Sequence, residues 1–196
     1  MAETTTVDAT RVVENRTVPT TGRWSVDNHH STVEFVARHL MVTKVRGRFL
    51  DYDAAIDIAE RPEDSRVDVT IQAGSISTGD EGRDGHVVGA DFLDVEQYPT
   101  LTFHSTAIRP TGASTWRVDG DLTIHGVTRP TVLDVEFGGV ASDPWGNTKA
   151  FFSASTEIDR EDFGLTWNQP LAGGGVLIGK KVRIELEVQA TPAAAA

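Results

Sequence analysis

The sequence predicts an all-β fold of about eight antiparallel strands. Most segments alternate apolar and polar residues with a period of two, short turn signals join them, and one region alone breaks the period. Long strands with one apolar face each bury that face by closing into a barrel or by stacking as a two-sheet sandwich. We therefore expect a single domain built around one apolar interior.

The first strand is predicted within residues 24–40. One of its faces carries apolar side chains and a histidine, at Val33, Phe35, Ala37 and His39. A polar cluster that includes Asp27 and His30 precedes this face. Two interpretations fit the pattern: plain architecture, or the wall of a pocket with ionisable groups at its ends.

The next segments continue the sheet until a break. Residues 45–60 are apolar at both parities, which indicates a bulge that switches the facing partway along. Residues 66–72 alternate cleanly, with Val67, Val69 and Ile71 on one face. The period fails over residues 79–99, where charges and glycines mix with apolar residues. We expect a short helical insert there, between the third and fourth strands.

From Thr100 the alternation resumes and continues almost to the end of the chain. The faces predicted to point inward mix large apolar side chains with small ones such as Ser105, Gly120, Ala154 and Thr156. A barrel of about eight strands either fills its interior with side chains or holds one small ligand. Both a long apolar cavity and a scaffold filled by its own side chains therefore fit the pattern.

The chain ends differ from the repeating segments. Residues 1–21 lack periodicity and predict a flexible N-terminal arm, residues 22–190 form the barrel domain, and residues 191–196 predict a frayed tail. Residues 1–21 contain no apolar core of a signal peptide, and no stretch approaches the roughly 20 apolar residues of a membrane span. We expect a cytoplasmic protein without stable membrane insertion.

Composition narrows the classes of partner. Twenty-nine acidic side chains against eighteen basic ones give a net charge of −11, and no run of lysine or arginine interrupts it. Such a surface repels phosphate backbones, so nucleic acid is not an expected partner. The absence of cysteine excludes disulfides, thiolate nucleophiles and cysteine-based metal sites.

Ordered motifs along the chain resemble the YceI-like family. They are Trp24-x-x-Asp27-x-x-His30-Ser31, Gly47-Arg48-Phe49, Arg83-Asp84-Gly85-His86, Asp91-Phe92-Leu93-Asp94, Gly120-Asp121-Leu122-Thr123-Ile124-His125-Gly126-Val127-Thr128 and Arg160-x-Asp162-Phe163-Gly164-Leu165. The match runs from about Trp24 to Val188. The resemblance implies an extended, lipocalin-like antiparallel barrel whose elongated pocket holds an isoprenoid chain, such as a polyprenyl phosphate or a quinone tail. Homodimers occur in the family, so a homodimer is a further expectation.

This resemblance assigns the expected site. The lipid tail is expected among inward residues, namely Phe35, Ala37, Phe49, Val69, Ile71, Phe92, Phe103, Val118, Leu122, Leu133, Phe152, Ala154 and Ile184. The polar head is expected near imidazoles and guanidiniums that can bond phosphate or quinone oxygens, namely His30, Arg38, His39, Arg83 and His86. The function predicted is binding, sequestration or transport of this lipid, without another cofactor.

Two other kinds of chemistry are weighed against lipid binding. The six histidines form no H-E-x-x-H or H-x-H pattern, so no metal site is predicted. An enzyme acting on a small apolar substrate in the same cavity is the alternative function. In that hypothesis His86 or His39 is the general base, and Asp84 or Asp27 orients it.

Overall fold

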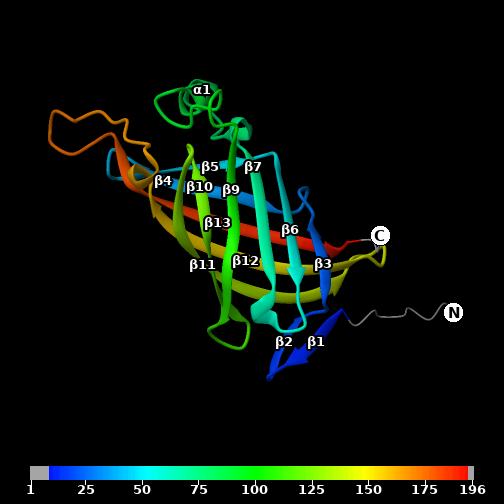
Figure 1. Ribbon diagram of the computed structural model, residues 1–196. Helices are drawn as coiled ribbons and strands as arrows, with labels where there is room; N and C mark the ends of the chain where they lie inside the picture. Colours follow the sequence, from blue (N-terminus) through cyan, green and yellow to red (C-terminus); the bar gives the residue numbers. More distant parts are fainter. Residues whose placement is uncertain (1–8, 194–196) are drawn as a thin grey trace.

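The computed structural model describes residues 9–193 and confirms the all-β prediction (Figure 1). The strands are β1 (Thr10–Val13), β2 (Arg16–Pro19), β3 (Gly22–Val26), β4 (Thr32–His39), β5 (Thr43–Phe49), β6 (Tyr52–Ile58), β7 (Arg66–Gln72), β8 (Ile76–Ser77), β9 (Thr100–Pro110), β10 (Thr115–Ile124), β11 (Val127–Ser142), β12 (Thr148–Asp159) and β13 (Ile178–Pro192). One α-helix, α1 (Glu81–Val88), and three short 3-10 helices, η1 (Pro62–Asp64), η2 (Ala73–Ser75) and η3 (Arg160–Phe163), complete the described elements.

The sheet closes into an eight-stranded antiparallel barrel. The closed order is β12, β11, β10, β9, β7, β6, β3 and β13, and β13 pairs back onto β12. The strands β4, β5 and β8 extend this sheet from the other edge of β13. In Figure 1 the wall formed by β6, β7, β9 and β10 crosses the wall formed by β4, β12 and β13. The closed interior lies between these walls.

Three long strands are each broken into two. The predicted first strand is divided by the turn at residues 27–31, so that β3 and β4 pair with different segments of β13. The predicted bulge within residues 45–60 lies at Leu50 and Asp51, between β5 and β6. The hydroxyl of Ser75 accepts hydrogen bonds from both amides there, at 3.1 and 3.0 Å. Together with the break between β7 and β8, these corners bend the barrel.

The helix lies where the broken period predicted it, between the third and fourth long strands. Asp80 caps it, because its Oδ1 accepts a hydrogen bond from the amide of Arg83 at 2.8 Å. The helix follows β8 and lies over one end of the strands (Figure 1). Residues at its side therefore border the interior of the barrel.

Residues 10–19 form a hairpin in place of the flexible arm predicted over residues 1–21. β1 and β2 pair antiparallel, and the buried Val18 joins the main apolar core. The Arg11 guanidinium donates hydrogen bonds to the carbonyls of Ala59 and Glu60, which ties the hairpin to the barrel. Residues 1–8 and 194–196 lie outside the described residues, and β13 continues to Pro192, within the predicted tail.

A partly buried ion pair joins the turn after β3 to β12. The Nζ of Lys149 lies 2.7 Å from Oδ2 of Asp27. The same carboxylate contacts Nδ1 of His30 at 3.1 Å and the amide of His29. These contacts, led by the hydrogen bond from Lys149, lower the pKa of Asp27 to about 2.

Replacing Lys149 by methionine should reduce the free energy of unfolding by about 1–2 kcal/mol at neutral pH. The pKa of Asp27 is about 2 when folded and about 3.9 in an unfolded chain. The stabilisation is therefore complete above pH ~4 and disappears as the pH falls through about 2. Urea unfolding of both proteins across this range checks it, with Lys44→Met as the exposed control. A difference in the free energy of unfolding between the wild type and Lys149→Met that does not change with pH would contradict this account.

Candidate functional site

The barrel interior contains two apolar cavities. The helix-side cavity, about 280 Å³, lies beside α1 and between β4, β12 and β13. The N-terminal cavity, about 160 Å³, lies toward the β1–β2 hairpin and η1. Of the residues predicted to contact a lipid tail, Phe35, Ala37, Phe49, Phe92 and Ile184 line the helix-side cavity, and Val69, Val118, Leu133, Phe152 and Ala154 line the N-terminal cavity.

A layer of side chains separates the two cavities. The three other predicted tail contacts, Ile71, Phe103 and Leu122, line neither cavity. Phe103 is buried and lies opposite Leu122 in the pairing of β9 with β10. On one side of this pair, Leu101 and Ile124 line the helix-side cavity, and on the other side, Ile108 and Val118 line the N-terminal cavity. Phe103 and Leu122 therefore divide the interior.

Gly120 makes room for the Phe103 ring. A Cβ atom at Gly120 would lie 2.4 Å from Cζ of Phe103 and 2.6 Å from the carbonyl oxygen of His104. The second contact is to backbone, which cannot rotate away. The absence of a side chain at Gly120 therefore allows the ring to lie across the interior.

Gly120→Ala should lower the free energy of unfolding by about 1–3 kcal/mol, because the new methyl group overpacks the Phe103 ring and the β9 backbone. Gly74→Ala is the matched control, since a Cβ atom there meets nothing within 4 Å. Chemical denaturation of both variants measures the effect. Equal stability of the two variants would show that the Phe103 ring does not occupy this position.

The polar side chains that line the helix-side cavity are mostly basic. Its ionisable side chains are three arginines and two histidines, Arg38, His39, Arg83, His86 and Arg160, with Thr78 as a further polar group. Within residues 9–193 no aspartate or glutamate lines it, although acidic residues outnumber basic ones in the chain. The cavity therefore combines an apolar body with hydrogen-bond donors suited to an anion or to carbonyl oxygens.

Arg160 is the most deeply buried of these groups, with 4% of its surface exposed. Its Nε donates to the carbonyl of Gly179 at 3.1 Å, and its Nη1 donates to the carbonyl of Leu165. Its Nη2 is buried and has no hydrogen-bond partner among the described residues. Burial lowers the pKa of Arg160, yet a guanidinium keeps its charge in proteins. An unpaired buried donor of this kind favours an acceptor supplied by a ligand.

The sequence suggests that Arg160, like Arg38, could meet an anionic head group, but exposed ion pairing is the commoner role of such a residue, so Arg160 is not among the predicted head contacts. The motif that contains it resembles an exposed turn, because η3 is short and carries Glu161 and Asp162. Neither carboxylate is within ion-pair distance of Arg160 in the part of the chain that the structure describes; Glu161 instead pairs with Lys180 at 2.6 Å. The sequence signal that could have pointed to Arg160 is an arginine followed closely by two apolar residues, Phe163 and Leu165, which are buried in the structure.

The insert positions the rim of this cavity. The His86 ring packs edge-on against Phe92 and Trp167, with ring centroids 5.0 and 4.6 Å apart, and its Nε2 lies 3.0 Å from Oδ2 of Asp91. Arg83 donates to Oγ1 of Thr78 at 2.7 Å. These aromatic contacts fix the orientation of the imidazole.

The structure separates other predicted groups from the cavity or from each other. His30 lines neither cavity and contacts Asp27 within the turn between β3 and β4. Asp84 accepts hydrogen bonds from the amide and hydroxyl of Thr78. Among the hydrogen bonds of the described residues, none joins Asp84 to His86. Asp27 pairs with Lys149 and His30. The orienting contacts expected for a histidine general base are therefore not formed by Asp84 or Asp27.

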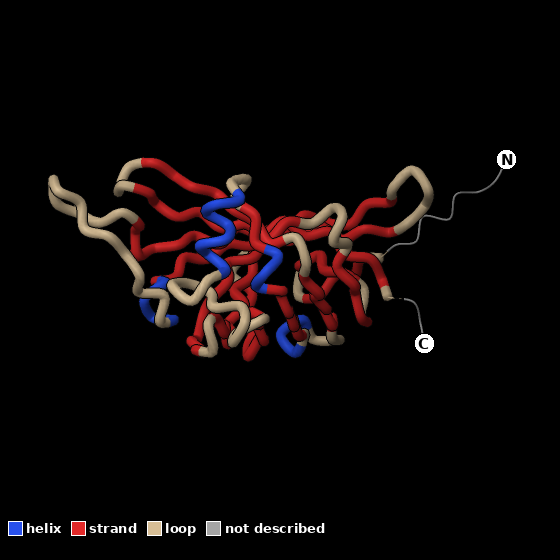
Figure 2. The backbone as a smooth tube through the Cα atoms, turned by 90° about the horizontal axis from the view of Figure 1, so that it is seen from above, coloured by secondary structure: helices blue, strands red, loops and turns tan. Residues whose placement is uncertain are grey.

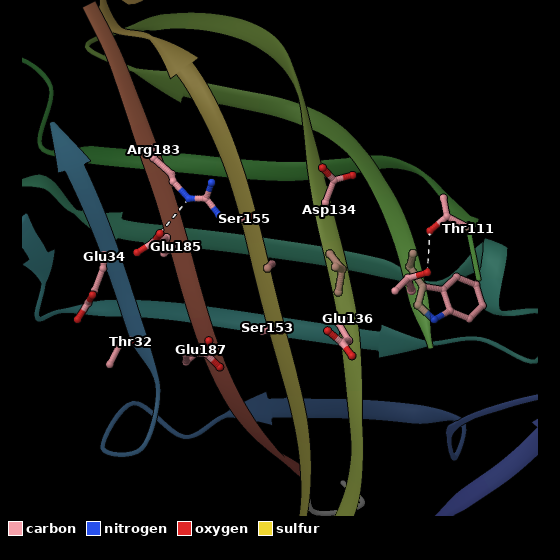
Figure 3. Close-up of a pocket in the computed structure, with 14 residues that line it drawn as sticks. Thr32, Glu34, Thr111, Asp134, Glu136, Ser153, Ser155, Arg183, Glu185 and Glu187 are labelled. Atoms are coloured by element: carbon pink, nitrogen blue, oxygen red, sulfur yellow. Dashed lines mark hydrogen bonds and ion pairs between the residues drawn. The ribbon is translucent and has the colours of Figure 1, made fainter. Parts of the chain in front are cut away.

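A larger hollow, about 570 Å³, lies on the outside of the barrel (Figure 3). Its lining is mostly polar, and its charged residues are Arg183 and five carboxylates, Glu34, Asp134, Glu136, Glu185 and Glu187, from β4, β11 and β13. Arg46 and Arg183 hydrogen-bond Glu185, both at 2.9 Å, and lower its pKa. This composition does not suit an apolar tail.

Two further features concern the described residues 9–193. No three histidine, aspartate or glutamate side chains gather closely enough there to ligate a metal ion. None of the helices in this part of the chain has the length and hydropathy that a bilayer crossing needs.

Comparison with known proteins matches the family model described as the YceI-like domain over residues 24–190. A UPF0312 protein of Pseudomonas syringae pv. syringae (strain B728a) is 39% identical over 140 residues, which cover 71% of this chain and 73% of that protein. A UPF0312 protein of Azotobacter vinelandii is 37% identical over the same length, with the same coverage.

Solved structures share the barrel. BcnA of Burkholderia cenocepacia superposes with a TM-score of 0.73 at 26% identity and covers 85% of this chain and 99% of its own. The YCEI protein of Campylobacter jejuni gives 0.68 at 32% identity, with 80% and 90% covered. A polyisoprenoid binding domain from Saccharophagus degradans gives 0.63 at 17% identity, with 89% and 100% covered, and at that identity it shares the fold alone.

Proposed function

The chain belongs to the YceI-like family, and we propose that it binds an amphiphilic isoprenoid lipid inside the barrel. The tail occupies the apolar interior, and the head lies at the donors of the helix-side cavity. A polyprenyl phosphate or an isoprenoid quinone has this division between an apolar chain and oxygen acceptors. Sequestration or transport of the lipid follows from enclosing a chain that is insoluble in water.

One observation carries the proposal: the helix-side cavity is apolar, yet the ionisable groups that the described part of the chain contributes to it are only arginines and histidines. Removing the tail from water supplies about 25 cal/mol per Å² of apolar area. Arg160 then supplies an unpaired Nη2 for the head. Because buried cations gain most from an anionic acceptor, the proposed head is a phosphate in preference to a neutral quinone.

The same residues do not favour the alternative of an enzyme. His86 retains Asp91 as a possible orienting group at 3.0 Å, but His86 is wedged between Phe92 and Trp167 at the rim. Among the described residues we identify no reacting group opposite His86. A cytoplasmic compartment and a homodimer stay predictions of this proposal.

The preference for the head should depend on Arg160. Farnesyl phosphate is expected to bind about 10- to 100-fold more tightly than farnesol, because charge-assisted hydrogen bonds contribute about 1.5–3 kcal/mol. Arg160→Gln should remove most of this preference while farnesol binding changes little. Isothermal titration calorimetry measures both ligands.

Two controls accompany this measurement. Arg183→Gln removes a guanidinium from the outer hollow and should leave the preference unchanged. Because Arg160 also bonds the carbonyls of Gly179 and Leu165, the thermal unfolding of each variant establishes that it is folded. A folded Arg160→Gln variant that keeps the full preference for phosphate would contradict this role.

Tail length should be limited by the layer at Phe103. The helix-side cavity alone lies just below the range of about 300–1,000 Å³ typical of ligand pockets. We expect the affinity of prenyl phosphates to rise with each isoprene unit and then to level off. Phe103→Ala joins the cavities and should move the plateau to a longer chain, as measured with geranyl, farnesyl and geranylgeranyl phosphates.

Phe151→Ala is the control for this series, since Phe151 lines neither cavity. Phe103→Leu is a milder second variant, because removing a buried phenyl group costs about 3–5 kcal/mol of stability. The layer does not set the tail length if Phe103→Leu and Phe103→Ala, both folded, keep the plateau of the wild type.

A further inference from the structure

Three consecutive apolar side chains are exposed at the turn between β4 and β5. Leu40, Met41 and Val42, together called the β4–β5 tip, are 45%, 51% and 74% exposed. The tip follows directly after Arg38 and His39, which line the helix-side cavity. It therefore lies at the mouth of that cavity and presents an apolar surface to the surroundings.

The backbone of the tip adopts a conformation that leucine and methionine rarely adopt. Leu40 and Met41 have φ angles of 50° and 63°, the left-handed region that glycine and asparagine adopt most readily. Large apolar side chains at such positions strain the turn, and their exposure means that packing in the barrel does not offset this strain. The stability of the fold therefore does not account for the large apolar side chains at the tip.

Positive charge surrounds the tip. Residues 38–48 contain Arg38, Lys44, Arg46 and Arg48 and no acidic residue, in a chain with a net charge of −11. Arg46 is paired with Glu185, whereas Arg38 and Lys44 lie nearest the tip. Arg38 and Lys44 lie directly opposite each other in the pairing of β4 with β5. In residues 9–193 no carboxylate lies within ion-pair distance of either side chain. The sequence has no run of basic residues, and the hairpin creates a basic patch by pairing two strands.

A second segment lies beside the tip. The amide of Leu40 donates to the carbonyl of Leu177 at 2.8 Å, which joins the tip to the loop of residues 168–177. That loop contains no charged residue, and it projects beyond the barrel on the same side (Figure 1). Both termini of the described chain lie toward the opposite side (Figure 2). One end of the molecule is therefore apolar at its extremity and basic just behind it.

We propose that the β4–β5 tip docks on the surface of an anionic lipid bilayer. Leu40, Met41 and Val42 enter the headgroup region, and Arg38 and Lys44 meet lipid phosphates while their stems stay in apolar contact. This arrangement turns the mouth of the helix-side cavity toward the lipid phase. The docking goes beyond the proposed function and does not require a lipid in the barrel.

Flotation of the purified full chain with vesicles tests the proposal. Binding is expected to vesicles of phosphatidylcholine mixed with phosphatidylglycerol, to be much weaker with phosphatidylcholine alone, and to fall as salt rises. The double variant Arg38→Gln/Lys44→Gln should lower the partition coefficient about 30-fold. Leu40→Asn/Met41→Asn should abolish most binding, and it is expected to fold because asparagine accepts the positive φ angles.

Two matched controls lie elsewhere. Trp145→Ser removes an apolar side chain that is 84% exposed at the β11–β12 turn, and Arg61→Gln removes an exposed guanidinium beside η1. Both should bind vesicles like the wild type. Loss of binding in Trp145→Ser with retention in the Asn variant would overturn the proposal. The proposal would also be overturned if the wild type bound no vesicles and Leu40→Asn/Met41→Asn changed the chain from dimer to monomer. That result would show that the tip drives self-association of the chain.

Discussion

The pairing of β13 on both of its edges is the constraint on which the rest of the structure depends. One edge pairs with β12 over residues 181–190, and the other pairs with β4 and then β3. This strand closes the sheet, so every inward face becomes the wall of one interior. An open sheet with the same alternation would leave these faces in water, and no cavity would exist.

Closure also explains why the interior is neither full nor continuous. Small residues such as Ala37 and Ala154 leave volume at the two ends, whereas Phe103 and Leu122 fill the middle. At one end the same closure buries Arg160 against the carbonyls of Leu165 and Gly179, with Nη2 left over. The polar and apolar parts of the proposed site thus arise from the same packing.

Much of this was predictable from the sequence, because a two-residue period fixes which side chains share a face. Phe35, Ala37 and His39 line one cavity as that period indicates. The period does not say which inward residues meet across the barrel, so the layer at Phe103 was not predicted. The period also gives no information on burial in short turns, which is why Arg160 was weighed as a head contact but not included in the predicted site. His30 was misplaced because the turn before β4 directs it to Asp27.

The central claim is that the barrel of the native protein encloses an isoprenoid lipid. Mass spectrometry of the purified protein under native and denaturing conditions tests it most directly, because denaturation releases whatever the interior holds. The account predicts a stoichiometric mass difference between the two spectra and a released isoprenoid with an acidic head. A protein whose native mass equals that of the bare chain, and which remains so after incubation with polyprenyl phosphates, would contradict it.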